Sequence, residues 1–132
     1  LSDGALDELI RAGEAIRSPM SVLATFALGG AVSDVADKDS AYPGRQSPFL
    51  LNINASWMDA AEDADHIAWC RRAWTALEPH GTGSGYVNFA VDEGQAQVAA
   101  IYGEERYRRL ATVKRVWDPN NLFRKNHNIL PV

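Results

Sequence analysis

The sequence has little cysteine, no long apolar segment and no excess of positive charge. Its one cysteine, Cys70, allows no internal disulfide, and a reducing cytoplasm is the simplest location for such a chain. No apolar run approaches the roughly 20 residues that cross a bilayer, and we expect no signal peptide. The 13 Lys and Arg residues against 17 Asp and Glu give a net charge of −4, which argues against binding to nucleic acid or to an anionic membrane. We therefore expect a cytoplasmic protein without these partners.

Motifs for nucleotide binding, serine hydrolysis and metal binding are also missing. No Gly-x-Gly-x-x-Gly follows a predicted strand, and neither a phosphate loop nor a Gly-x-Ser-x-Gly elbow occurs. His66 and Cys70 are four residues apart on a predicted helix, but two ligands do not complete a zinc site. Cys70 also lies on the apolar stripe of that helix, so we assign it to the core. The stretch with Asp34, Asp37 and Asp39 lacks the glycine and the glutamate of a calcium loop. We predict no metal site.

The composition that remains is that of an ordinary globular protein, with 46% apolar and 23% charged residues in a chain of 132. That length suits one compact domain. Apolar residues at helical spacing predict helices at 3–17, 61–77 and 104–117. Alternating patterns predict strands at 20–28, 49–58 and 85–90, with a further strand at 31–36. The order of these elements favours an α+β fold, in which an antiparallel sheet carries its helices on one face.

The last predicted helix is rich in basic residues. Glu104 and Glu105 precede Arg108 and Arg109 by four residues, which is the spacing of ion pairs along a helix. Such pairs are typical of a solvated surface. The sequence therefore predicts that the basic cluster, which also includes Arg106, forms an exposed helix face rather than a nucleic-acid surface.

Two pairs of polar residues are candidates for a functional site. In the predicted strand 85–90, Tyr86 and Asn88 share one face, where a phenol and an amide could donate to an oxyanion or a ring carbonyl. A phenolate there could also accept a proton. The alternative is a half-buried sheet face with two satisfied polar groups. In the tail, Asn126 and Asn128 would point the same way from an extended backbone, and the apolar residues around them indicate a docked tail.

Several short blocks in the last third of the chain resemble the C-terminal signature of the berberine-bridge-enzyme-like, FAD-linked oxidases. In chain order these blocks are Tyr86-Val87-Asn88-Phe89, Tyr102-Gly103, Arg109-Leu110 with Lys114, Asp118-Pro119-Asn120-Asn121-Leu122-Phe123 and Asn126-x-Asn128-Ile129. Looser agreement precedes them in Leu28-Gly29-Gly30-Ala31, Ala41-Tyr42-Pro43-x-Arg45 and Trp57. The resemblance implies that residues 1–84 are the C-terminal half of a substrate domain and that residues 85–132 are a berberine-bridge-like C-terminal segment.

The resemblance also implies an FAD-dependent oxidoreductase that transfers hydride from a small organic substrate to the flavin. In full-length members an N-terminal region binds FAD, so the resemblance places the main FAD site and a partner domain upstream of this chain. It implies that Tyr86 is a catalytic residue at the substrate pocket, and that Asn88, Asn126 and Asn128 contact or orient the flavin. Many members have a second tyrosine at the position of Phe89. Phenylalanine cannot take a proton, so the base would be Tyr86 or a residue outside the chain.

A second hypothesis is a non-catalytic α+β module that kept the family's C-terminal fold and serves binding or dimerisation. Phe89 and the missing N-terminal region favour it. An exposed sheet face in such a module would need a partner, which allows a homodimer. Fold resemblance does not carry over the choice of substrate, so the substrate stays open.

Overall fold

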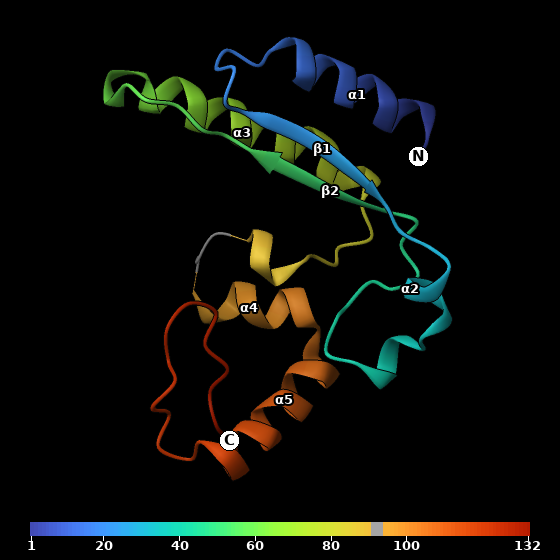
Figure 1. Ribbon diagram of the computed structural model, residues 1–132, viewed down its shortest axis with the longest axis vertical. Helices are drawn as coiled ribbons and strands as arrows, with labels where there is room; N and C mark the ends of the chain where they lie inside the picture. The colour runs from blue at the N-terminus through green and yellow to red at the C-terminus, as the bar shows by residue number, and fades with distance from the viewer. Residues whose placement is uncertain (91–93) are drawn as a thin grey trace. The chain divides into compact units, whose positions relative to one another are not determined.

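A computed structural model describes residues 1–90 and 94–132 of the chain, which divides into two compact units (Figure 1). The first, called the sheet unit, comprises Leu1–Ala27 and Phe49–Thr82. The second, called the C-terminal unit, comprises Leu28–Pro48 and Gly83–Val132. Each unit is therefore built from two separate segments of the chain, and each is described by itself.

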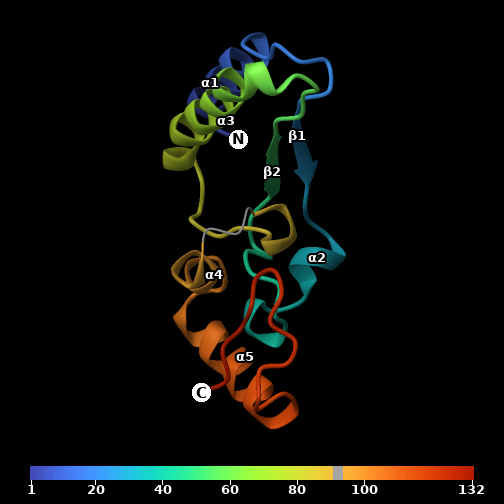
Figure 2. The ribbon, with the colours of Figure 1, turned by 90° about the vertical axis from the view of Figure 1, so that its left-hand side faces the viewer.

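The sheet unit is a two-stranded antiparallel sheet with two helices. Strand β1 (Val22–Ala27) pairs with β2 (Phe49–Asn54) in a register that sets Val22 opposite Asn54 and Ala27 opposite Phe49. Helices α1 (Asp3–Glu14) and α3 (Asp63–Leu77) pack against each other and lie on the same side of the strands (Figure 2). The predicted α+β class, with helices on one face of an antiparallel sheet, is confirmed.

The core of the sheet unit lies between its two helices. Trp69 on α3 is 5% exposed, and its indole Nε1 donates a hydrogen bond of 2.9 Å to the carbonyl of Ala12. The small side chains of Ala5 and Ala12 on α1 and of Ala73 on α3 are buried as well, and small side chains allow two helix backbones to approach closely. His66 is buried as well, and its ring stacks on Trp57 with the centroids 5.0 Å apart. This histidine is thus part of the packing.

Cys70, which the apolar pattern assigns to the core, is half-buried on α3. Its sulfur lies 3.9 Å from the carbonyl oxygen of Ile53 on β2. Burial raises the pKa of this thiol, while the positive charge of Arg71 opposes the rise. The side chain is therefore a packing residue at the helix–sheet contact, and its thiolate is disfavoured at neutral pH.

The C-terminal unit consists of helices and loops. It contains α2 (Ala31–Asp34), α4 (Gln95–Tyr102) and α5 (Glu104–Trp117), with short 3₁₀ turns at Asp37–Asp39 and Val87–Phe89. Gly103 joins α4 to α5 with a φ of 77°, a left-handed conformation that glycine adopts without steric cost. The two helices contact each other, and Val98 and Ile101 on α4 and Ala111 on α5 are buried.

The structure corrects two predicted strands and adds one helix, all in the C-terminal unit. Residues 31–36, predicted as a strand, begin with the short helix α2, and the Ser33 side chain bonds back to the Gly30 carbonyl there. Residues 85–90, also predicted as a strand, form a 3₁₀ turn in which the Phe89 amide bonds the Tyr86 carbonyl. Helix α4 was not predicted. The described residues hold two strands rather than the three or four that the sequence predicts.

Helix α5 has the predicted bounds, 104–117. None of the helices in the described part of the chain is long and apolar enough to cross a membrane.

Candidate functional site

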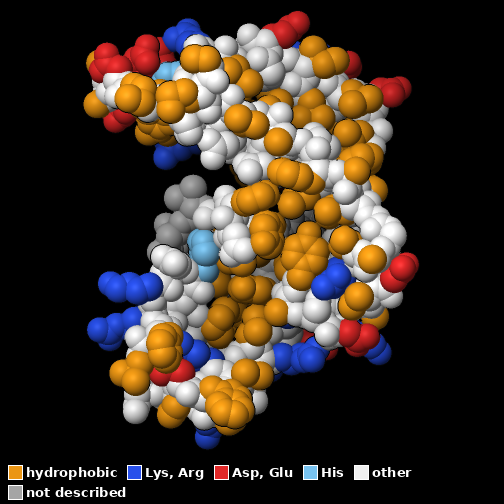
Figure 3. All heavy atoms as spheres, viewed as in Figure 1, with side chains coloured by type: hydrophobic (Ala, Val, Ile, Leu, Met, Phe, Trp, Pro, Cys, Tyr) orange, Lys and Arg blue, Asp and Glu red, His pale blue; other side chains and the backbone are white. Residues whose placement is uncertain are grey.

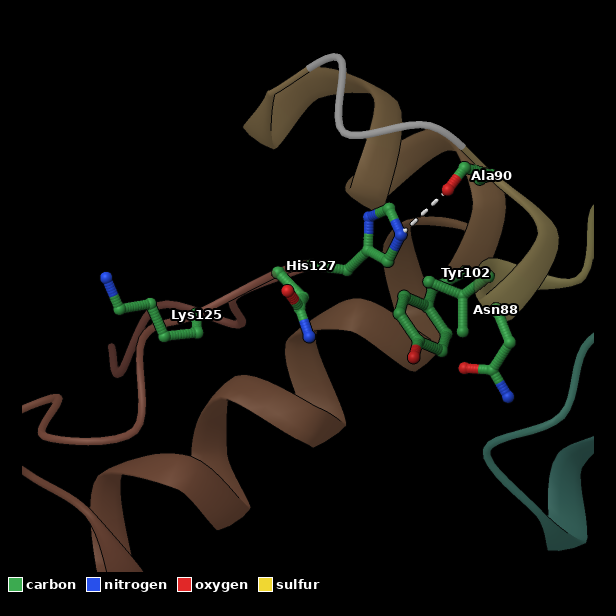
Figure 4. Close-up of a pocket in the computed structure, with 7 residues that line it drawn as sticks. Asn88, Ala90, Tyr102, Lys125 and His127 are labelled. Carbon is green, nitrogen blue, oxygen red and sulfur yellow. Dashed lines mark hydrogen bonds between the residues drawn. The ribbon is translucent and has the colours of Figure 1, made fainter. Parts of the chain in front are cut away.

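A hollow of about 500 Å³ lies in the C-terminal unit (Figure 4). Three segments line it: the 3₁₀ turn, the end of α4 and the tail. Its lining residues are Val87, Asn88, Ala90, Tyr102, Lys125, Asn126 and His127. This volume is within the range of small-molecule sites, and the lining combines an aromatic ring with carboxamides. Two of the four predicted site residues, Asn88 and Asn126, therefore line one hollow.

Tyr86 lies beside this hollow and is bonded to one of its walls. The side-chain amide of Asn88 donates a hydrogen bond of 2.7 Å to the Tyr86 hydroxyl oxygen. The ring of Tyr86 packs edge-on against Tyr42, with centroids 5.7 Å apart, and against Phe89 at 4.9 Å. The predicted phenol–amide pair exists, but a 3₁₀ turn forms it and not the alternation of a strand. The tight turn leaves the two side chains close enough to bond.

The tail segment forms a compact turn at the hollow. Asn126 has a φ of 57°, and its carbonyl accepts a bond of 2.8 Å from the Asn128 amide. His127 Nε2 lies 3.1 Å from the Ala90 carbonyl oxygen (Figure 4), a hydrogen bond in which the ring N–H donates to the carbonyl. The extended backbone that the sequence predicts for Asn126 and Asn128 is wrong, because Asn126 has a left-handed φ and begins a tight turn. Asn128 does not line the hollow.

Three side-chain atoms in this tail, Asn121 Oδ1, His127 Nδ1 and Asn128 Oδ1, are covered from water and have no hydrogen-bond partner among the described residues. Buried polar atoms without partners cost free energy. A tail with such atoms gains stability when a donor reaches them.

Asp118 fixes the start of the tail. Its carboxylate accepts bonds from the backbone amides of Leu122 and Phe123, at 2.7 and 3.0 Å, and lies 2.6 Å from the ammonium of Lys114. The Lys114 contact, together with the two backbone amides, outweighs the opposing effect of burial and lowers the pKa of Asp118. Asn121 allows the turn by adopting a φ of 51°. The tail is therefore held by charge-assisted bonds at its first turn.

Asp37 fixes the other loop of this unit, residues 28–48. Its carboxylate pairs with Arg106 of α5 and accepts a bond of 3.3 Å from the Arg45 amide. Burial raises the pKa of Asp37, but these hydrogen bonds and the charge of Arg106 outweigh it, so the net shift is downward. The prediction that Arg106 is part of an exposed helix face is wrong, since its side chain is 16% exposed. Arg108 does pair with Glu104 on the surface, as predicted.

Sequence reasoning did not single out Tyr102, Lys125 or His127 as lining residues. Tyr102 is in one of the blocks that carry the family resemblance, and His127 lies between the two predicted asparagines. These positions in the sequence could have indicated both residues as lining the site. Burial raises the pKa of Tyr102, which keeps its phenol protonated at neutral pH. Among residues 1–90 and 94–132, no three His, Cys, Asp or Glu side chains gather as metal ligands.

Comparisons with known proteins agree on one family. Residues 85–130 match the family model described as "Berberine and berberine like". The chain is 35% identical over 130 residues to the FAD-linked oxidoreductase aurO of Gibberella zeae, covering 96% of this chain and 25% of that protein. It is 46% identical over 81 residues to (R)-6-hydroxynicotine oxidase of Paenarthrobacter nicotinovorans, covering 58% of this chain and 18% of that protein. The family resemblance is confirmed.

A solved structure gives the same answer for the fold. A variant of the berberine-bridge-enzyme-like protein BBE-like 1 from Physcomitrella patens superimposes with a TM-score of 0.75 over 100% of this chain and 27% of that one, at 23% identity. The chain spans about a quarter of the length of the relatives it matches.

The family's cofactor provides a test of the hollow. An isoalloxazine ring presents carbonyl oxygens and ring nitrogens at its edge, which take amide donors, and flat faces, which take apolar or aromatic walls. The hollow offers the carboxamides of Asn88 and Asn126 together with the ring of Tyr102. These residues fit the ring end of FAD.

Proposed function

We propose that this chain is the C-terminal part of an FAD-dependent oxidoreductase that oxidises a small organic substrate by hydride transfer to the flavin. One observation carries the proposal. Asn88 and Asn126, which belong to separate blocks of the family-matching segment, line one hollow of the C-terminal unit. The relatives named as FAD-linked oxidoreductases support the same chemistry.

The residues at the hollow have separate proposed roles in binding the flavin and in moving protons. When bound, FAD would supply the redox chemistry as the hydride acceptor, and the protein would bind and orient it and move protons near it. Asn88 and Asn126 would hold the flavin ring through their carboxamides, and Asn128 would help to orient it. Tyr86 is the proposed catalytic residue, since its hydroxyl already accepts a bond from Asn88 and can exchange a proton with a substrate C–OH. Phe89 beside it has no hydroxyl and offers only packing.

The remaining FAD site would be supplied by an N-terminal FAD-binding domain of the same protein. The exposed apolar side chains of the C-terminal unit support this, because large exposed apolar patches usually mark interfaces. These side chains lie at the end of α5 and in the tail, where Figure 3 shows hydrophobic atoms at the surface: Val113, Val116, Trp117, Leu122 and Phe123. In this proposal residues 1–84 belong to the substrate domain, residues 85–132 form the flavin-facing segment, and the protein is cytoplasmic.

The test uses protein purified from the complete reading frame that contains this chain. We expect it to carry FAD, visible as flavin absorbance, and to lose that absorbance when a substrate is added without oxygen. Tyr86→Phe should slow the loss of absorbance with little change in FAD content. A folded protein that neither carries nor takes up FAD would overturn the proposal.

A non-catalytic binding or dimerisation module is the second candidate. The exposed apolar side chains of β1 favour it, since Val22 is 51% and Phe26 is 45% exposed. If the complete protein is colourless and sediments as a dimer, while Val22→Lys makes it monomeric, this candidate replaces the first.

A further inference from the structure

Arg106 joins three segments of the C-terminal unit through one guanidinium group. Its Nε donates 3.2 Å to the Ser40 carbonyl, and Nη2 donates 2.9 Å to the Asp37 carbonyl and also bonds the Asp37 carboxylate. Its Nη1 donates 2.7 Å to the carbonyl of Tyr102, at the end of α4. Helix α5, the loop 37–45 and a wall of the hollow are thus tied to the same planar group.

The loop that Arg106 holds is closed by a second arginine. Arg45 Nε donates 2.8 Å to the Ser40 hydroxyl, and Nη1 donates 3.0 Å to the Val32 carbonyl. The guanidinium carbon of Arg45 lies 5.4 Å from the centroid of the Tyr42 ring. Tyr42 therefore projects from a loop whose two ends are both fixed by charge-assisted bonds.

Tyr42 connects this fixed loop to Tyr86, the proposed catalytic residue. Its ring packs edge-on against Tyr86 at 5.7 Å, and Phe89 contacts Tyr86 at 4.9 Å. The ring of Tyr86 thus lies against two aromatic neighbours, while Asn88 bonds its hydroxyl. If the loop moved, Tyr86 would lose one of these contacts, and its hydroxyl would be displaced relative to the hollow.

We propose that Arg106 is a positioning residue for Tyr86, acting through the loop 37–45 and Tyr42. The hydrogen bond from Arg106 to the Tyr102 carbonyl also fixes the end of α4, which lines the hollow. The positioning follows from the contacts above, and its consequence for turnover rests on the proposed function. Lysine cannot replace this group, since four bonds in one plane need the guanidinium fork.

The first test reads the position of Tyr86 without any turnover. In the complete protein, 3-fluorotyrosine at position 86 reports the surroundings of that ring by its ¹⁹F resonance. We expect Arg106→Lys to shift and broaden this resonance. Arg108→Lys, on the same helix but in an exposed pair with Glu104, should leave it unchanged. An unchanged resonance in a folded Arg106→Lys variant would overturn the inference.

A second variant keeps the test decisive if Arg106→Lys does not fold. Tyr42→Leu leaves the Arg106 bonds in place and removes the ring that contacts Tyr86 and the Arg45 guanidinium. The ¹⁹F resonance should move in this variant as well. If it does not, Tyr42 transmits nothing and the inference fails.

Kinetics then separate this inference from the proposed function. We expect Arg106→Lys to lower kcat on the order of tenfold with less than a twofold change in KM, because a misplaced catalytic group costs rate rather than binding. A shifted resonance with unchanged kcat would keep the positioning role and remove Tyr86 from the reaction. A protein without FAD would overturn the proposed function while the ¹⁹F measurement still decides the positioning.

Discussion

Each of the two units is stabilised internally by a different kind of interaction. In the sheet unit, backbone pairing of β1 with β2 and the packing of α1 on α3 around Trp69 provide the order. In the C-terminal unit, side chains bond to the backbone of irregular loops: Arg106 to residues 37 and 40, and Asp118 to residues 122 and 123. Repetitive structure needs little help from charged side chains, whereas a loop needs them to satisfy its backbone groups.

The hollow belongs to the second kind of unit. Loops held by fixed polar contacts can place carboxamides and phenols at chosen points, which a regular strand does only at every second residue. We therefore expect truncation of a buried apolar side chain to destabilise the sheet unit most. Removal of a charged group should destabilise the C-terminal unit most.

The largest effect should come from the core of the sheet unit. Trp69→Ala removes a buried ring and the bond to the Ala12 carbonyl, so we expect a loss of about 3–5 kcal/mol in the free energy of unfolding. Trp74→Ala is the matched control, since Trp74 lies on the same helix and is 56% exposed; its cost should be within about 0.5 kcal/mol. Urea denaturation measures both. Equal losses would show that α3 does not pack as described.

The second largest effect on stability should come from removing the negative charge of Asp118 in the C-terminal unit, and this effect should depend on pH. The pKa of Asp118 is lower in the folded chain than in the unfolded one, mainly through Lys114. Its contribution is therefore complete above the unfolded value of about 3.9 and is lost as the pH falls through the lower folded value.

Asp118→Asn should accordingly lower Tm at pH 7, and the difference from the parent chain should close as the pH falls below 4 or so. Thermal unfolding at a series of pH values measures this. Asp39→Asn, an exposed change in the same unit, is the control and should have little effect. A Tm difference that persists unchanged at low pH would mean that the charge of Asp118 does not hold the tail.

The smallest effect should come from the first helix cap. The Ser2 side chain accepts a bond of 3.2 Å from the Ala5 amide, so Ser2→Ala should cost about 1 kcal/mol. Ser2→Asp should retain most of the stability, because aspartate also caps helices. Urea denaturation of the two variants checks this. Equal stability of Ser2→Ala and the parent would show that the end of α1 is already frayed.

Sequence patterns predicted the sheet unit better than the C-terminal unit, for physical reasons. Helix α5 is the exception within the C-terminal unit, because an apolar stripe and Pro119 both define it and it has the predicted bounds. Helix α4 was missed because Gln95–Tyr102 is too short and too evenly apolar to show a face, and Gly94 gives no side-chain cap. The run from Tyr86 to Phe89 alternates over too few residues to distinguish a strand from a turn.

The lining of the hollow was predicted in part. Asn88 and Asn126 were predicted from resemblance and do line one hollow, whereas the buried role of Arg106 depends on partners 66 and 69 residues away. Local spacing, which pairs Glu104 with Arg108, holds no information on such distant partners. That is why Arg106 was expected on the surface.

The flavin-facing role of the C-terminal unit is the central claim, and two asparagines of one tail test it most directly. Asn126 lines the hollow and Asn121 does not, yet both have positive φ, 57° and 51°, so glycine fits either position. In the complete flavin-bound protein, Asn126→Gly should change the visible circular dichroism of the flavin, and Asn121→Gly should not. Identical spectra for Asn126→Gly and the parent protein would contradict the account.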